Sequence, residues 1–242
     1  MAIEENIGRG RMLPPLPERM RPQNLEGYVG QTHLIGKGCI LRNMIESGNL
    51  SSFILWGPPG VGKTTLSRIV AKSLNREFFT LSAVSAGVKD VRDVIDRARS
   101  NSLFSSGQSP ILFIDEIHRF NKSQQDALLG AVEDGTIVLI GATTENPSFE
   151  VITPLLSRCQ VFVLKSLERN DLQSLLERAL TTDELLSHMK IEVRETDALF
   201  RHSGGDARKL LNILEIVTGS QAGASEIIID NTTVTSCLQE NI

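Results

Sequence analysis

The chain has 242 residues, of which 40% are hydrophobic, and a formal net charge of −4 at pH 7. This length and hydrophobic content are enough for one sizeable core, with or without a small helical domain. The longest apolar runs have the length of a strand, which excludes a membrane span. The acidic balance does not point to a basic nucleic-acid-binding domain, and three widely spaced cysteines without a CxxC pair support neither a disulfide framework nor a zinc site.

The first 20 residues carry Gly and Pro without periodicity, which predicts an extended N-terminal arm. The segment begins with polar and acidic residues and has no signal-peptide core, so we expect a cytoplasmic protein. Four arginines in and beside the arm form a local basic cluster, which either touches DNA or belongs to a solvated leader: Arg9, Arg11, Arg19 and Arg21.

A glycine-rich segment at residues 57–65, Gly-Pro-Pro-Gly-Val-Gly-Lys-Thr-Thr, follows an apolar run and opens a helical pattern. Glycines at such a turn let the backbone aim its N–H groups at phosphate oxygens. Lys63 supplies charge for the outer phosphates, and Thr64 supplies a hydroxyl for Mg²⁺. The alternative, an ordinary Gly-rich turn, does not need this strand–loop–helix context. The predicted phosphate-binding residues are Gly57, Pro58, Pro59, Gly60, Val61, Gly62, Lys63, Thr64 and Thr65.

Strand-like and helical segments alternate up to about residue 165. Strands are expected at residues 53–56, 77–82, 111–114, 137–140 and 161–164. Helices are expected at residues 66–74, 88–99, 123–134 and 148–157. This alternation predicts right-handed crossovers and a parallel sheet sandwiched by helices, an α/β fold.

After Lys165 the pattern changes to amphipathic helices at 168–180 and 206–217, with no buried strand between them. A shorter helix is expected at 195–203, and the stretch from Glu226 on is ambiguous. We therefore predict an α/β core over residues 21–165, followed by a small all-helical domain over residues 166–242.

Two acids follow the apolar run at residues 111–114. A strand that ends in an acid sets a carboxylate at the carboxyl edge of the sheet, so Asp115 is a candidate Mg²⁺ ligand. Glu116 is placed to orient and deprotonate an attacking water. The pair favours hydrolysis over transfer to a bulky acceptor; the alternative is an ordinary surface Asp-Glu dipeptide.

Polar residues at the ends of neighbouring strands are expected to lie near these two acids. Thr144 is preferred over Thr143 as the hydroxyl that holds the water or touches the terminal phosphate, with strand-end capping as the alternative. Ser82 is a candidate to hydrogen-bond Glu116 and hold it inactive until a ligand arrives. For His118 we expect a structural role rather than a catalytic one.

Two arginines complete the set of candidate residues. Arg158 lies at a predicted helix end just before a strand, where a solvated surface residue is the simplest interpretation. Arg208 lies in the first turn of a helix that Asp206 can cap. A cation is unfavourable at that end of the helix dipole, which suggests that Arg208 serves another purpose.

Together these segments resemble the AAA+ ATPases, and within them the clamp-loader and branch-migration group. The resemblance narrows to the replication-associated recombination protein A family and its Werner-interacting relatives, and it covers residues 17–220. The segments that carry it are residues 19–22 (Arg-Met-Arg-Pro), 30–34 (Gly-Gln-Thr-His-Leu), 85–90 (Ser-Ala-Gly-Val-Lys-Asp), 118–126 (His-Arg-Phe-Asn-Lys-Ser-Gln-Gln-Asp) and 141–147 (Gly-Ala-Thr-Thr-Glu-Asn-Pro).

The resemblance implies ATP and Mg²⁺ as cofactors, with Tyr28, Val29 and Gly30 lining the adenine pocket. It implies that Asp115 is the metal ligand, beside Thr64, and that Glu116 is the catalytic base. The remaining implied roles are those of Thr144 as first sensor, Arg158 as an arginine finger reaching the neighbouring subunit's site, and Arg208 as a lid-domain sensor acting on its own site.

The resemblance also implies a DNA-dependent ATPase that acts at stalled or gapped replication forks and remodels DNA or its bound proteins. Expected partners are DNA forks, gaps or single-strand/duplex junctions, single-stranded-DNA-binding protein and further copies of the chain, in the cytoplasm with the nucleoid. Family members continue into a helical C-terminal domain that drives tetramerisation; the sequence ends at Ile242, so we expect that domain to be absent. Either the chain is a fragment, or it assembles without that domain.

Other functions stay open from the sequence. A clamp-loader subunit should carry a collar domain, and a Holliday-junction branch-migration motor a winged-helix domain; neither is evident. A nucleotide-gated adaptor would bind ATP without hydrolysing it, which an intact Glu116 disfavours. A small-molecule kinase would need an acceptor-binding segment, and none is visible.

Overall fold

The computed structural model describes residues 13–102 and 108–239. The chain divides into two compact units. The large unit comprises Pro22–Ser174 and Gly204–Ala207, and the small unit comprises the described residues up to Arg21, Leu175–Ser203 and the described residues from Arg208 onward. The division falls inside α9 (Arg169–Thr182), so the boundary at residue 166 stays a prediction.

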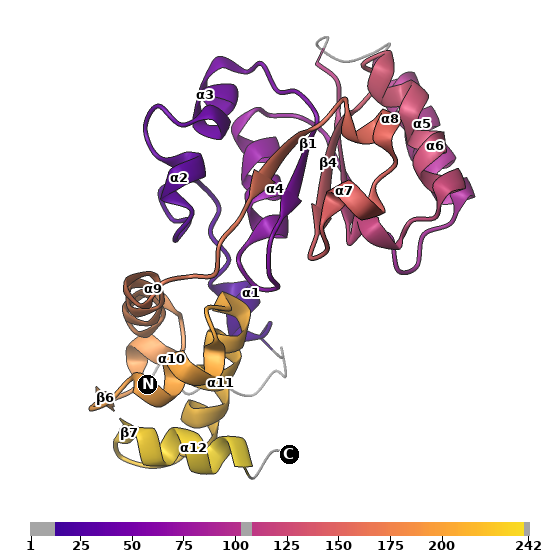
Figure 1. Ribbon diagram of the computed structural model, residues 1–242. Helices are drawn as coiled ribbons and strands as arrows, with labels where there is room; N and C mark the ends of the chain where they lie inside the picture. The colour runs from indigo at the N-terminus through magenta and orange to yellow at the C-terminus, as the bar shows by residue number, and fades with distance from the viewer. Residues whose placement is uncertain (1–12, 103–107, 240–242) are drawn as a thin grey trace. The chain divides into compact units, whose positions relative to one another are not determined.

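A five-stranded parallel sheet forms the centre of the large unit, which confirms the predicted α/β fold (Figure 1). The strands lie in the order β2-β3-β4-β1-β5. Their bounds are β1 (Phe53–Trp56), β2 (Phe78–Ser82), β3 (Ile111–Asp115), β4 (Val138–Thr143) and β5 (Gln160–Val163). Because β4 lies between β1 and β3, the ends of these three strands meet at the carboxyl edge of the sheet.

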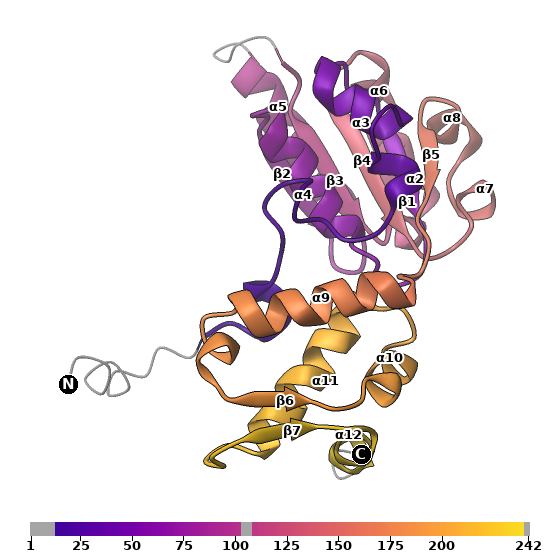
Figure 2. The same cartoon turned by 90° about the vertical axis from the view of Figure 1, so that its left-hand side faces the viewer.

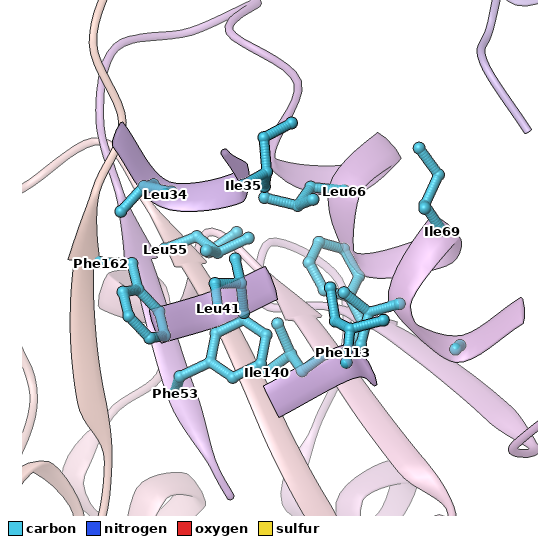
Figure 3. Packing of buried hydrophobic residues seen from close by; sticks show 14 of the residues in the cluster. Leu34, Ile35, Leu41, Phe53, Leu55, Leu66, Ile69, Phe113, Ile140 and Phe162 are labelled. Carbon is cyan, nitrogen blue, oxygen red and sulfur yellow. The ribbon is translucent and has the colours of Figure 1, made fainter. Parts of the chain in front are cut away.

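Helices cover both faces of this sheet (Figure 1). Side chains alternate between faces along each strand, so Phe53 and Leu55 join the cluster beneath one set of helices while Ile54 joins the other. Figure 3 shows the first cluster around Phe53 and Phe162, whose rings meet edge to face. The first face carries α2 (Thr32–Ile35), α3 (Ile40–Ser47) and α4 (Lys63–Ser73); the second carries α5 (Val88–Ser102), α6 (Lys122–Glu133) and α8 (Thr153–Leu156).

Two predicted helices differ in detail. The helix expected at 148–157 is wrong, since the chain forms two separate turns, α7 (Pro147–Glu150) and α8. Pro154 lacks the N–H that a continuous helix needs, so a new turn begins beside it. The helix expected from residue 123 begins at Lys122, because Asn121 and Gln124 form a reciprocal capping box.

The small unit is mostly helical, but the prediction that it is entirely helical is wrong. It contains η3 (Leu186–His188), α10 (Asp197–Ser203), α11 (Ala207–Ser220) and α12 (Asn231–Gln239), besides the end of α9. Two short strands, β6 (Ile191–Val193) and β7 (Ile227–Ile229), pair in parallel (Figure 2). Their β-branched residues favour strands, and runs of three residues are too short to show a periodicity.

The predicted extended arm is corrected where the structure describes it. Residues 1–12, which include Arg9 and Arg11, lie outside the described residues. Residues 16–19 form a short helix, α1 (Leu16–Arg19), which belongs to the small unit. The Arg19 guanidinium lies 2.7 Å from the Asp183 carboxylate and 3.1 Å from that of Glu215. Arg19 is therefore paired with acids of its own unit, whereas one expectation from the sequence was that it contacts DNA.

Asp183 is expected to make the small unit sensitive to acid. Its side chain is only 1% exposed; burial acts to raise the pKa of Asp183, but hydrogen bonds from Arg19 and from the N–H groups of Leu186 and Leu185 outweigh burial and hold that pKa below its usual value. A carboxyl group whose pKa is lower in the folded than in the unfolded state stabilises the fold at pH values above its unfolded pKa of about 4. This stabilisation is lost as the pH falls through the folded-state pKa.

Asp183→Asn should therefore lower the free energy of unfolding at pH 7 by about 3 kcal/mol, because it leaves the Arg19 charge poorly paired. The variant should also lose part of the acid dependence that wild type shows in urea unfolding at descending pH. Glu192→Gln, which removes an exposed partner of Arg194, is the matched control and should change little. Equal stability of Asp183→Asn and wild type at every pH contradicts the assignment.

Among the described residues, no helix is long and apolar enough to cross a membrane.

Candidate nucleotide-binding site

The segment predicted to bind phosphate joins β1 to α4. Gly60 and Gly62 have φ values of +68° and +96°, in the left-handed region that favours glycine. Gly62 is the N-cap of α4, so the N–H groups of the first helical turn adjoin the loop. Loop and helix N-terminus together therefore present backbone N–H groups of the kind that bind phosphate.

Lys63 is folded back over this loop. Its Nζ donates to the carbonyl oxygens of Gly57, at 2.7 Å, and Pro58, at 2.9 Å. The residue is only 7% exposed. The ammonium is thus held at the loop, where phosphate oxygens would be stronger acceptors than neutral carbonyls.

Tyr28 packs against the same loop from the segment before α2. Its hydroxyl donates to the Val61 carbonyl at 3.1 Å, and burial raises the pKa of Tyr28, so the hydroxyl keeps its proton. Val29 and Gly30 follow it, and both are partly buried. The Gln31 side chain bonds both the N–H and the carbonyl of Lys165, which anchors this segment at the end of β5.

A second segment reaches the loop from residues 204–207, a contact that the sequence did not predict. The Ala207 N–H donates to the Gly60 carbonyl at 3.1 Å. The Asp206 carboxylate lies so close to Gly60 that any side chain there would overlap it. In the sequence, the signal was the pair of glycines before Asp206, which allows two successive residues with positive φ.

Gly62→Ala is expected to lower the affinity for ATP about tenfold or more. A Cβ at this position would lie 2.6 Å from the Tyr28 hydroxyl, on a backbone whose φ of +96° already disfavours alanine. Titration with a fluorescent ATP analogue measures the effect. Gly130→Ala is the matched control, since that glycine lies in α6 with open space around its Cβ position. Equal ATP affinity of Gly62→Ala and wild type would contradict the loop's assignment.

The predicted acids lie at the carboxyl edge of the same sheet. Asp115 ends β3 and pairs in register with Ser82 of β2. The N–H of Gly57, in the phosphate-binding loop, donates to the Thr143 carbonyl at the end of β4. The loop and the strand ends that carry the acids are therefore linked through β4.

The structure brings Glu116 and Thr144 together. The Thr144 hydroxyl lies 3.4 Å from Glu116 Oε2, and His118 Nδ1 lies 3.2 Å from the same oxygen. The exposed Ser82 makes no hydrogen bond to Glu116 among the described residues, so the prediction for Ser82 is not supported. His118, to which the sequence assigned a structural role, contacts the candidate base directly.

The two candidate arginines lie elsewhere. Arg158 follows α8, and its guanidinium pairs with Glu133 and donates to the Pro154 carbonyl at 2.6 Å. Neither partner belongs to the phosphate-binding loop. Arg208 is exposed in the first turn of α11, within the small unit. Their roles as finger and sensor stay predictions.

Comparison with known proteins agrees with this geometry. Residues 53–167 match the model of the ATPase family associated with various cellular activities (AAA). Replication-associated recombination protein A of Coxiella burnetii is 53% identical over 206 residues, which are 84% of this chain and 46% of that protein. The chain belongs to the AAA ATPases of the replication-associated recombination protein A family.

Two further proteins, one compared by sequence and one by structure, are similar to this chain. The ATPase WRNIP1 of Dictyostelium discoideum is 49% identical over 205 residues, covering 84% of this chain and 23% of that protein. The structure of the Thermotoga maritima RuvB Holliday junction branch migration motor superposes with a TM-score of 0.73 at 26% identity, covering 92% of this chain and 73% of that one. The chain spans about half the length of its bacterial relatives in the replication-associated recombination protein A family.

Proposed function

We propose that the chain hydrolyses ATP in a DNA-dependent manner and that this hydrolysis serves the maintenance, recombination or repair of replication forks. The observation that carries the proposal is the contact of Glu116 with Thr144 at the sheet edge that also holds the phosphate-binding loop. The names of the similar proteins support replication and recombination as the setting.

In this proposal the residues around the loop bind and orient ATP. Loop N–H groups and Lys63 hold the phosphates, while Tyr28 and Val29 line the adenine pocket. Thr64 and Asp115 offer one hydroxyl and one carboxylate, a sparse oxygen set that fits Mg²⁺ bound together with phosphates and water. Mg²⁺ would neutralise phosphate charge. Among the described residues no cluster of three or more His, Cys, Asp or Glu could hold a metal by itself.

Hydrolysis then needs a base for water. Glu116 accepts the proton of a water that attacks the terminal phosphorus, and Thr144 holds that water or phosphate. Arg158 of one copy reaches the site of the next, and Arg208 acts on its own site. The proposed partners are forked or gapped DNA, single-stranded-DNA-binding protein and further copies of this chain, with the protein acting at the nucleoid.

The proposal is tested by the ATPase rate of the chain with forked DNA, gapped duplex, a four-way junction, blunt duplex and no DNA. A severalfold stimulation by forked or gapped DNA over blunt duplex is expected, and it should weaken as salt rises. Hydrolysis that is indifferent to every DNA contradicts the DNA-dependent part of the proposal. Stimulation by a four-way junction alone favours a branch-migration motor, the function named for the Thermotoga maritima relative.

A further inference from the structure

The backbone at Glu116 has an uncommon conformation. Its φ of 55° and ψ of 48° lie in the left-handed region, which residues other than glycine rarely adopt. The Arg119 N–H donates to the Glu116 carbonyl at 2.8 Å and closes a turn, η2 (Ile117–Arg119). This turn brings His118 back onto the side chain of Glu116, although only one residue separates them in sequence.

The contacts of His118 assign its proton. His118 Nδ1 lies 3.2 Å from Glu116 Oε2 and 3.0 Å from Thr143 Oγ1. The Thr143 hydroxyl donates its single proton to the Glu145 carbonyl at 3.2 Å, and it accepts from the Glu145 N–H at 3.0 Å. Because the only proton of the Thr143 hydroxyl goes to Glu145, Thr143 Oγ1 accepts from His118, which places a proton on Nδ1.

These contacts also distinguish the two oxygens of Glu116. Thr144 donates to Oε2, and His118 Nδ1 lies 3.2 Å from the same oxygen. Among the described residues no group bonds to Oε1. The side chain as a whole is 33% exposed, while that of His118 is 13% exposed. The carboxylate is therefore held by one oxygen, and the other is left for water.

We propose that His118 is a positioning residue, which holds Oε2 so that Glu116 presents Oε1 to the attacking water. The proposal rests on the proposed role of Glu116 as base. In the step itself, the water oxygen bonds to the terminal phosphorus, its proton passes to Oε1, and the bond to the ADP oxygen breaks. His118 keeps its proton throughout, so its contribution is geometric.

Substitutions of His118 test this proposal through kcat and KM. His118→Ala should lower kcat for ATP about tenfold to a hundredfold, the scale of a misplaced catalytic group, with KM and analogue affinity changed less than about twofold. In His118→Asn, the amide nitrogen stands at the place of Nδ1, so activity should be partly restored. In His118→Gln, it stands nearer the place of Nε2 and should restore less. The exposed His188→Asn is the control.

The histidine tautomer gives a readout that does not need hydrolysis. ¹⁵N NMR of the unliganded chain at about pH 8.5, where ordinary imidazoles are neutral, should show the Nδ1–H tautomer for His118. The resonance is identified by its loss in His118→Asn. An Nε2–H tautomer overturns the proposal, whether or not the variants fold. An unchanged kcat in His118→Ala overturns it as well.

Glu116→Gln, measured in parallel, separates this inference from the proposed function. If Glu116→Gln abolishes hydrolysis and His118→Ala does not lower it, the positioning role alone is wrong. If Glu116→Gln leaves hydrolysis unchanged, the assignment of the base is wrong, and the role of His118 fails with it.

Discussion

Glu116→Gln is expected to lower kcat for ATP hydrolysis by about 10²- to 10⁴-fold, the range typical of a removed general base. The amide keeps the shape of the side chain and its contact with Thr144, but it cannot take the proton of water. ATP should still bind with near wild-type affinity, because Lys63 and the loop glycines are untouched. Single-turnover release of phosphate measures the chemical step, and titration with a fluorescent analogue measures binding.

Glu150→Gln is the matched control, since that glutamate is exposed on α7 and makes no side-chain contact with the site among the described residues. Both variants should unfold at the temperature of wild type. Hydrolysis by Glu116→Gln at the wild-type rate would favour the adaptor alternative, in which bound nucleotide fixes a conformation and is not consumed.

The strands were the most predictable part of the fold. The buried run at residues 111–114 predicted β3 almost to its ends, because a strand covered on both faces is apolar throughout. The β4 strand, expected to end at residue 140, continues through Gly141, Ala142 and Thr143. Glycine and alanine carry little strand preference, and here the ladder to β1 extends the strand through them.

The candidate site was predictable where its functional residues lie together in one short segment of the sequence. The phosphate-binding loop and the acids after β3 are local patterns, and parallel topology places them at one edge. The contact of His118 with Glu116 was not predicted, because it depends on the left-handed backbone conformation of Glu116, and no sequence pattern indicates that conformation. The approach of Asp206 to Gly60 escaped it because nearly 150 residues separate the two in the sequence.

Arg158→Ala is expected to reduce ATP hydrolysis in assembled protein by up to about 10³-fold, the lower end of the range for an arginine finger acting between subunits. The physical reason is that Arg158 bonds Glu133, Pro154 and Ser157 in its own chain, so its guanidinium makes no contact with its own phosphate-binding loop among the described residues. Its pair with Glu133 is half-exposed on both sides. Such a pair is weak enough to give way to a phosphate.

Mixing two inactive variants tests this assignment directly. Arg158→Ala lacks the finger but keeps Glu116, whereas Glu116→Gln lacks the base but keeps Arg158. In a mixed assembly, a site of the first variant receives the finger of the second, so the mixture should regain hydrolysis that neither variant shows alone. The rate per chain of the wild-type protein should rise with its concentration. Arg99 is an exposed arginine that pairs with Asp96 and Asp134, so Arg99→Ala is the control and should behave as wild type. A rate per chain that is flat with concentration and the same in Arg158→Ala would show that the site is complete within one chain.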